Sequence, residues 1–168
     1  MKKRLIRLLR PKLFAESIKD ISVEALLAQG KKGVLVDLDN TLTIWESEVL
    51  PQETIDWIGA AKKQGLKVCL LSNNKGERVK RIAAILDIPY VDRATKPRRR
   101  AYRQGMETLG THPTETAVIG DQIFTDVLGG NRLKLYTILV APISTHEFTG
   151  TKFMRILERA VLRRLRRL

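Results

Sequence analysis

The sequence has little of what marks several common classes of protein. Its 168 residues include one cysteine, 6 prolines and 11 glycines. The single cysteine, Cys69 within an apolar run, excludes a disulfide framework and a cysteine-based zinc site, and it suggests a reducing compartment. So few prolines and glycines exclude collagen-like and low-complexity sequence. No stretch of about 20 uninterrupted apolar residues occurs, so no transmembrane helix is expected.

The remaining composition is that of an ordinary globular protein. Hydrophobic residues make up 43% of the chain and charged residues 29%, a balance that excludes a disordered tail. A chain of this length can bury a core without disulfides or a structural metal. We therefore expect residues 1–168 to form a single domain.

Acidic residues are almost missing from the two ends of the chain. Residues 1–12 hold six basic residues and no acid, and residues 152–168 hold seven basic residues and one acid, Glu158. The ends supply +12 of the net charge of +13, while residues 13–151 are nearly neutral. Two cationic ends on a neutral body point to an anionic partner, either a phospholipid membrane or a nucleic acid.

Both ends are also amphipathic. From residue 153 onward, apolar residues recur at helical spacing with arginines on the other side, which predicts a basic amphipathic helix over residues 152–168. Residues 1–14 interleave apolar and basic residues in a similar way, although Pro11 must end or kink a first helix. Such segments bind anionic membranes by inserting their apolar side chains. The alternative is that the apolar sides pack on the domain and leave the arginines solvated.

The scarcity of aromatic residues at the ends favours a membrane over a nucleic acid. Phe14 and Phe153 are the only aromatics there, and single-stranded nucleic acids are bound largely by stacking on aromatic side chains. Arg7 and Arg10 interrupt what would be the apolar core of a secretory signal, whereas an organelle presequence stays an alternative. We expect a cytoplasmic protein bound peripherally to the inner face of the membrane. The sequence makes no prediction of the oligomeric state.

Between the ends, segments with the pattern of strands alternate with segments with the pattern of helices. Strands are predicted at residues 34–38, 67–72, 88–91, 116–120 and 135–140, and helices at residues 53–64, 77–86, 97–109 and 123–129. Gly129 and Gly130 are expected to close the last of these helices. The order predicts an α/β fold with a Rossmann-like, doubly wound parallel sheet. Such sheets bind ligands at the carboxyl ends of their strands.

Polar side chains follow three of the predicted strands and precede the third helix. They are Asp37, Asp39, Thr41, Ser72, Asn73, Lys96, Asp121 and Asp126. Clustered carboxylates without histidine or cysteine bind a hard cation such as Mg²⁺. A metal ion and a lysine together would neutralise a phosphoryl group, so that one carboxylate can attack phosphorus. A second carboxylate can then protonate the departing oxygen and later activate water.

Four motifs in this order resemble those of the haloacid dehalogenase superfamily of phosphatases. They are VLVDLDNT at residues 34–41, LLSNN at residues 70–74, Lys96 with Pro97, and VIGDQIFTD at residues 118–126. The resemblance implies a phosphoric monoester hydrolase that depends on Mg²⁺ and acts through an aspartyl-phosphate. An aspartate at position 39 is the variant typical of phosphatases rather than of dehalogenases.

The resemblance implies roles for the acids that follow the first and fourth strands. Asp37 is the nucleophile, and Asp39 is the general acid and base. Mg²⁺ is held by Asp37, by Asp121 and by the backbone carbonyl of Asp39. Thr41 orients the loop that carries the acid.

The other candidates bind or support the phosphate by the same resemblance. Ser72 and Asn73 bind the phosphoryl oxygens, and Lys96 steadies both the nucleophile and the phosphate. Asp126 supports the metal site or Lys96. The alternative for Ser72, Lys96 and Asp126 is that they are ordinary loop or surface residues.

The chain leaves no room for the cap domain that many enzymes of this superfamily carry. A short loop and one helix fill residues 39–72, and one helix and one short strand fill residues 72–96. The enzyme is therefore expected to be capless. An uncapped site is open to solvent, so it suits a phosphate presented on a membrane, a protein or a nucleic acid.

Within the superfamily, the chain resembles the YqeG-like group of subfamily IIIA over nearly its full length. The shared features are DLDNT at residues 37–41, GDQIFTD at residues 120–126, the small capless body and the basic amphipathic start. This group is related to phosphatidylglycerophosphate phosphatases of phospholipid biosynthesis. The resemblance implies that the chain converts phosphatidylglycerophosphate to phosphatidylglycerol at the membrane surface.

Two other functions stay open at this point. The first is a phosphatase of the same family that acts on nucleic-acid ends or phosphoproteins, with the arginines contacting phosphates. The second is a non-catalytic binding module that keeps the fold. The intact set of acids argues against the second.

Overall fold

The computed structural model describes residues 2–144 and 149–165. Six strands form one sheet in the order β1-β6-β5-β2-β3-β4, and every neighbouring pair is parallel. The strands are β1 (Leu13–Ala15), β2 (Gly33–Val36), β3 (Lys67–Leu71), β4 (Tyr90–Val91), β5 (Thr116–Gly120) and β6 (Tyr136–Val140). The strand order reverses next to β2, which confirms the predicted doubly wound α/β sheet.

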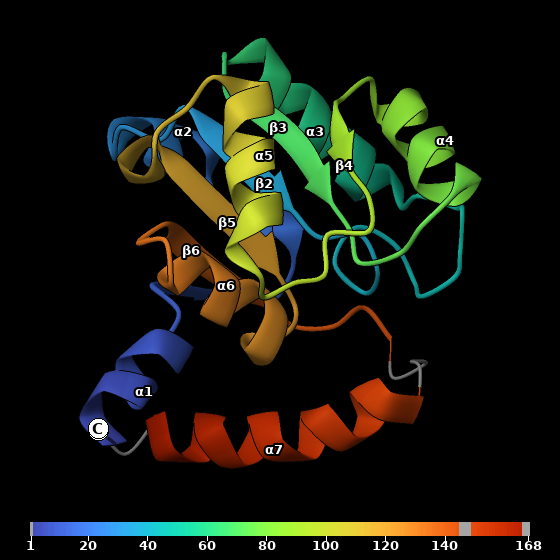
Figure 1. The fold of residues 1–168 in the computed structure, drawn as a ribbon. Coiled ribbons are helices and arrows are strands. Elements are labelled where there is room, and N and C mark those ends of the chain that lie inside the picture. Colours follow the sequence, from blue (N-terminus) through green and yellow to red (C-terminus); the bar gives the residue numbers. More distant parts are fainter. Residues whose placement is uncertain (1, 145–148, 166–168) are drawn as a thin grey trace.

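Helices cover both faces of this sheet, with α2, α3 and α4 behind it and α5 and α6 in front (Figure 1). The helices are α1 (Lys2–Leu9), α2 (Val23–Ala28), α3 (Gln52–Lys63), α4 (Glu77–Leu86), α5 (Arg99–Leu109), α6 (Leu128–Asn131) and α7 (Thr149–Leu165). Three single turns join them: η1 (Ile18–Asp20), η2 (Pro113–Glu115) and the π-helical η3 (Ile123–Val127).

The sheet separates two apolar cores because successive side chains of a strand point to opposite faces. In β2, Val34 and Val36 join the core with α2, α3 and α4, whereas Leu35 joins the core with α5. All three side chains are fully buried, and each contributes about 1.5–3 kcal/mol through burial. A strand buried on both faces reads as a continuous apolar run, which is why β2 was predictable.

The amino-terminal segment contains a strand that the sequence pattern did not predict. Helix α1 ends before Pro11, as expected, but Leu13–Ala15 then forms β1, which pairs with β6 at the edge of the sheet. Three residues are too short to show a period of two. The helix predicted from Pro97 begins instead at Arg99, after a turn in which the Arg98 amide donates to the Thr95 carbonyl.

The prediction of one helix over residues 123–129 that ends at the two glycines is wrong. Residues Ile123–Val127 are π-helical, and Gly129 and Gly130 lie inside the following α6 rather than after its end. Both glycines are required for close packing. A Cβ on Gly129 would lie 2.2 Å from the Tyr102 hydroxyl, and one on Gly130 would lie 2.5 Å from Thr137 Cγ2.

The segment between Asp39 and Lys96 confirms the capless architecture. It contains only α3, β3, α4, β4 and the loops that join them. Helix α7 then crosses beneath the carboxyl edge of the sheet, next to α1 (Figure 1). It covers most of the predicted range 152–168, of which residues 166–168 lie outside the described part of the chain. Within the described part, no helix is long and apolar enough to cross a membrane.

Candidate active site

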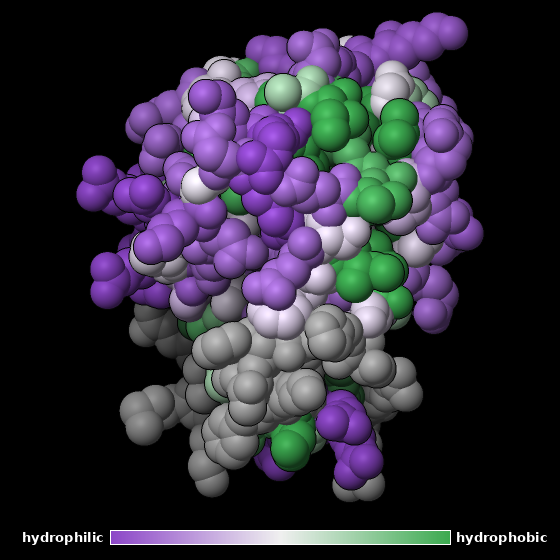
Figure 2. Space-filling view, turned by 90° about the vertical axis from the view of Figure 1, so that its right-hand side faces the viewer, coloured by the Kyte–Doolittle hydropathy of each residue, from purple (hydrophilic) through white to green (hydrophobic). Residues whose placement is uncertain are grey.

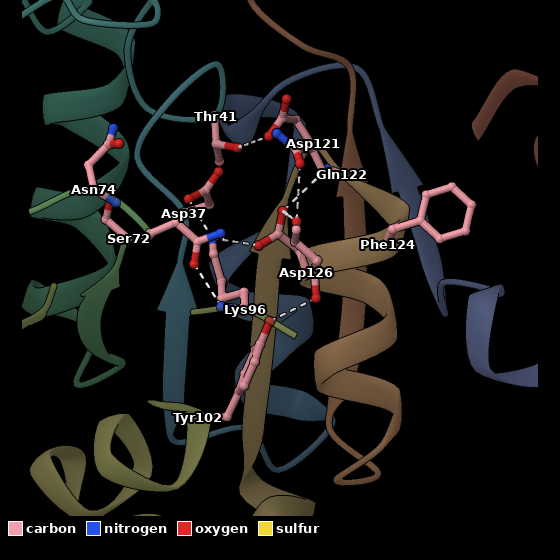
Figure 3. Close-up of polar contacts among 12 residues, drawn as sticks. Asp37, Thr41, Ser72, Asn74, Lys96, Tyr102, Asp121, Gln122, Phe124 and Asp126 are labelled. Atoms are coloured by element: carbon pink, nitrogen blue, oxygen red, sulfur yellow. Dashed lines mark hydrogen bonds and ion pairs between the residues drawn. The ribbon is translucent and has the colours of Figure 1, made fainter. Parts of the chain in front are cut away.

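The predicted site residues meet at the carboxyl ends of the three central strands, β5, β2 and β3. Asp37 directly follows β2, Asp121 follows β5 and Ser72 follows β3. The strands are in register, with Val36 opposite both Leu70 and Ile119. The side chains after them therefore lie at one level of the sheet. Figure 3 shows Ser72 on one side of Asp37, and Asp121 and Asp126 on the other.

Lys96 lies between two carboxylates that follow different strands. Its Nζ is 2.6 Å from Asp37 Oδ1 and 2.8 Å from Asp126 Oδ1 (Figure 3). All three residues are buried. Lys96 is itself held in place, because its backbone amide donates to Asn73 Oδ1 over 2.7 Å. The structure thus brings together three of the predicted residues, and a fourth, Asn73, contacts the lysine backbone.

Burial and the neighbouring charges act in opposite directions on these groups. Burial raises the pKa of the Asp37 carboxyl well above its ordinary value, and the Lys96 ammonium opposes this only in part. Burial also acts to lower the pKa of Lys96, but the carboxylates of Asp126 and Asp37 outweigh it and raise that pKa. Lys96 is therefore a permanent cation, and the raised pKa of Asp37 shows that this one ammonium does not fully offset the cost of burying a charged carboxylate beside it.

The acids form a donor set that fits a divalent cation. One carboxylate oxygen from each of Asp37, Asp121 and Asp126 lies within 4.8 Å of the others, and all three residues are buried. Asp121 is oriented by Thr41, whose hydroxyl donates to Asp121 Oδ1 over 3.2 Å. One ammonium beside three buried carboxyl groups leaves the site short of positive charge, and oxygen ligands are those that Mg²⁺ prefers. The residues present therefore fit the predicted metal.

Asp126 is held from several directions. Its Oδ2 accepts the backbone amide of Gln122 at 3.2 Å and lies 3.3 Å from the Thr125 hydroxyl. The backbone of Gly120 approaches it so closely that a Cβ there would lie 2.2 Å from Asp126 Cγ. One carboxylate oxygen of Asp126 thus binds Lys96, and the other binds groups of its own loop. This position suits support of the lysine, which is one of the two roles predicted for Asp126.

Asp39 points away from this cluster toward α4. Its Oδ1 is 2.9 Å from Nη2 of Arg78 and accepts the backbone amide of Glu46 at 3.2 Å. Its Oδ2 accepts a short hydrogen bond from the side-chain amide of Asn74. Asp37 and Asp39, two residues apart, thus have different surroundings: one is buried against Lys96 and the other is half-buried against Arg78. Different surroundings suit two carboxylates for different chemical roles.

Ser72 is buried at the end of β3. Its hydroxyl oxygen accepts the backbone amide of Asn74 at 3.1 Å. The backbone amide of Ala94 donates to the Ser72 carbonyl over 2.9 Å. The same pairing of loops therefore fixes both Ser72 and the segment that leads to Lys96.

A glutamate from the cationic carboxyl-terminal helix completes the support of the site. Glu158 on α7 is buried, and its Oε1 accepts the backbone amides of Ile123 at 2.5 Å and Phe124 at 3.4 Å. These amides begin η3, the turn that carries Asp126. Phe124 itself points away from the acids (Figure 3). Helix α7 is thus attached to the loop between Asp121 and Asp126.

Sequence reasoning missed Asn74, Arg78 and Glu158. Arg78 lies in the first turn of α4, the end of that helix nearest the carboxyl edge of the sheet. Its proximity to the site was predictable once the strand order was assumed. Glu158 carried a signal of its own, because it is the single acid among residues 152–168.

Comparison with known proteins adds to this geometry. Residues 5–134 match the family model of the haloacid dehalogenase-like hydrolases. The chain is 38% identical to the probable phosphatase YqeG of Bacillus subtilis over 157 residues, which are 94% of this chain and 91% of that protein. It is 28% identical to the chloroplastic phosphatidylglycerophosphate phosphatase 1 of Chlamydomonas reinhardtii over 160 residues. That match covers 90% of this chain and 58% of the algal protein.

Solved structures share the fold at lower identity. The cobalt-bound deoxy-D-mannose-octulosonate 8-phosphate phosphatase of Haemophilus influenzae superposes with a TM-score of 0.55 at 22% identity. The match covers 80% of this chain and 89% of that one. An uncharacterised protein of Listeria monocytogenes gives the same TM-score at 17% identity, over 78% of this chain and 97% of that one.

Proposed function

The chain belongs to the haloacid dehalogenase-like hydrolases and is a YqeG-like phosphatase, and on this premise we propose that it hydrolyses phosphatidylglycerophosphate to phosphatidylglycerol with Mg²⁺ as cofactor. The observation that carries the chemistry is the pairing of Lys96 with Asp37 and Asp126, beside Asp121. The name of the algal relative supports the choice of lipid.

Asp37 is the nucleophile in the proposed reaction. Its carboxylate oxygen attacks the terminal phosphorus, and the bond between phosphorus and the glycerol oxygen breaks. Asp39 gives its proton to that departing oxygen, which yields phosphatidylglycerol and a phosphate ester on Asp37. Asp39 then takes a proton from a water molecule whose oxygen attacks phosphorus. Asp37 leaves with its electron pair, and inorganic phosphate is released.

The other residues hold the charges of this reaction in place. Lys96 is the permanent cation that orients Asp37 and offsets the phosphoryl charge, and Asp126 orients Lys96. The Ser72 hydroxyl and the Asn73 side chain bind phosphoryl oxygens, although Asn73 also supports the Lys96 backbone. Asp37, Asp121 and the Asp39 carbonyl would hold Mg²⁺, which supplies positive charge to the phosphoryl oxygens.

Helix α7 supports a membrane as the place of action. Its inner side, with Leu165 buried and Val161 and Leu162 half-buried, packs near η3. Its outer side exposes Ile156 and Leu157, at 58% and 42% of their surface, among exposed arginines. Part of the apolar stripe thus packs on the domain, and part of it is exposed. Apolar side chains among arginines fit an anionic lipid interface, which favours a peripheral protein on the inner face of the membrane.

The test is Mg²⁺-dependent phosphate release from phosphatidylglycerophosphate in mixed micelles, with a soluble aryl phosphate and a 3′-phosphorylated oligonucleotide as parallel substrates. We expect kcat/KM to be highest for the lipid. Preference for the oligonucleotide, or for a phosphopeptide added as a fourth substrate, would retain the phosphatase and contradict the lipid assignment. Absence of turnover on every ester, with and without Mg²⁺, would indicate a non-catalytic module.

A further inference from the structure

The loop that follows the candidate nucleophile exposes large apolar side chains. Val49 is 79% exposed and Ile44 is 43% exposed. Ile143, after β6, is 41% exposed, and its backbone amide donates to the Asn40 carbonyl over 3.0 Å. We call Ile44, Val49 and Ile143 the apolar rim. Single exposed apolar residues are common on protein surfaces, but three beside one catalytic loop need an explanation.

The apolar rim is fixed to the loop that carries Asp39. The Asn40 amide donates to the Thr43 carbonyl over 2.7 Å, and the Thr43 hydroxyl donates to the Val49 carbonyl over 2.5 Å. Arg78, which contacts Asp39, also donates to the Ser47 carbonyl from Nε and Nη2, over 3.0 and 2.7 Å. These bonds fix the backbone of the loop at Thr43, Ser47 and Val49, and the Val49 side chain is exposed. The exposure therefore belongs to an ordered loop at the edge of the site.

The loops at the carboxyl ends of β3 and β4 also expose cations. Lys75 follows β3, and Arg93 and Arg98 follow β4, so all three lie at the carboxyl ends of the strands, and all three are exposed. The loop itself carries two exposed acids, Glu46 and Glu48, and Glu48 is paired with Arg81. Figure 2 shows the side of the molecule that is at the right in Figure 1, where apolar side chains form a band down the upper half of the view with hydrophilic side chains on both sides. Apolar side chains flanked by cations complement the interface of an anionic bilayer.

We propose that the apolar rim inserts into the headgroup region of an anionic phospholipid bilayer, so that a lipid phosphate reaches Asp37 without leaving the membrane. This inference rests on the proposed function and deepens it, because it assigns the membrane contact to the edge of the site and not to the basic ends alone. Such a contact would guide the substrate at a site that has no cap domain inserted between Asp39 and Lys96.

Trp45 lies within this loop, next to Ile44, and reports on insertion. The other tryptophan, Trp57, is buried and donates its indole N–H to the Ile21 carbonyl over 2.7 Å, so its emission serves as a constant background. The probe is vesicles of phosphatidylglycerol and phosphatidylcholine with brominated acyl chains. We expect the emission to shift to shorter wavelength and to lose intensity on binding. Brominated vesicles of phosphatidylcholine alone should change it far less.

Val49→Asp and Ile85→Asp form a matched pair of variants. Ile85 is also an exposed aliphatic side chain, 61% exposed on α4 near the opposite end of the strands. Val49→Asp should abolish the quenching of Trp45. It should also lower the ratio of bilayer-lipid turnover to aryl phosphate turnover about tenfold, the equivalent of 1.4 kcal/mol. Ile85→Asp should leave both unchanged.

Three results would overturn the inference, and they are distinguishable. Flotation and lipid turnover with unaltered Trp45 emission would place the membrane contact on α1 and α7 and leave the proposed function intact. Absence of both flotation and lipid turnover would remove the lipid substrate along with the inference. A change in sedimentation caused by Val49→Asp in the absence of lipid would assign the apolar rim to a second copy of the chain.

Discussion

At the scale of single residues, Lys96 joins acids that follow two different strands. The lysine shares its charge between Asp37 and Asp126, at 2.6 and 2.8 Å. Removing either acid leaves Lys96 with a partner, but removing Lys96 leaves the acids unbalanced in a buried site. The position of Asp126 depends in turn on the absence of a side chain at Gly120.

We therefore predict that Gly120→Ala impairs the enzyme. The new Cβ would lie 2.2 Å from Asp126 Cγ, so Asp126 must move and Lys96 with it. A displacement of this size should lower kcat about 100-fold and cost about 1–3 kcal/mol of unfolding free energy. Steady-state kinetics on an aryl phosphate and urea unfolding measure the two effects.

Gly59→Ala is the control for this substitution. Gly59 is exposed within α3, and nothing lies within 4 Å of a Cβ placed there. Alanine should stabilise the helix by about 0.5–1 kcal/mol and leave kcat unchanged. Equal kcat values for the two alanine variants would show that Asp126 does not position Lys96.

The sequence was sufficient for some residues of the site and insufficient for others. Asp37 and Asp121 were predictable because a carboxylate directly after an apolar strand is out of place in a core. The strand order would have placed Arg78 near the site, but the contacts of Arg78 and Asn74 with Asp39 were not predictable, because they depend on how α4 and the loop after β3 pack against the loop after β2. Such contacts join residues more than 30 positions apart and leave no local pattern.

At the scale of secondary-structure elements, a buried side chain of α7 binds the first backbone amides of η3. Glu158 accepts the amides of Ile123 and Phe124 at the start of η3, where a helical turn has no partners of its own. The contact crosses 35 positions of the chain. The contact gives the single acid among residues 152–168 a structural role.

Glu158→Ala should weaken the attachment of α7 to η3, whereas Glu158→Gln should largely preserve it. Alanine leaves the buried Ile123 amide without this acceptor, which costs about 1–3 kcal/mol of unfolding free energy, and kcat should fall because η3 carries Asp126. Glutamine keeps an oxygen for both amides. Arg163→Gln, at an exposed position of α7, should change stability by less than about 0.5 kcal/mol. Equal kcat values for the alanine and glutamine variants would show that the contact between α7 and η3 does not affect catalysis.

Long and buried elements could be predicted from the sequence, whereas short or exposed ones could not. The strands buried on both faces, β2, β3, β5 and β6, appeared as apolar runs and were predicted within two residues of their bounds. Strand β1 has three residues, two of them exposed, and is defined by its pairing with β6. The π-helical turn η3 was not predictable, because its geometry depends on contacts with Glu158 and Gly120.

At the scale of the whole molecule, the charge is concentrated at the two ends of the chain, one of which also exposes apolar side chains. The net charge of +13 comes almost entirely from the two ends, and α1 and α7, which carry them, lie together beneath the sheet (Figure 1). The outer side of α7 adds Ile156 and Leu157 to this cationic face. Electrostatic attraction and apolar insertion should therefore act together on a membrane.

Vesicle flotation should depend on both contributions. We expect binding to rise with the phosphatidylglycerol content of the vesicles and to weaken as salt is raised, because exposed charges are screened. The double substitution Ile156→Ser and Leu157→Ser should lower partitioning at least about tenfold through lost burial. Binding that is indifferent to salt and to anionic lipid would refute the electrostatic contribution.

The central claim is that Asp37 carries the phosphoryl group between substrate and water, and Asp39→Asn tests it most directly. An aryl phosphate has a leaving group that needs no proton, so this variant should still phosphorylate Asp37 but lack the base that activates water. Mixed with a ³²P-labelled aryl phosphate and Mg²⁺ and quenched in acid, it should retain label on the peptide that contains Asp37. Label should be absent from Asp37→Asn. Continued phosphate release by Asp37→Asn, or turnover without any labelled protein, would contradict the account.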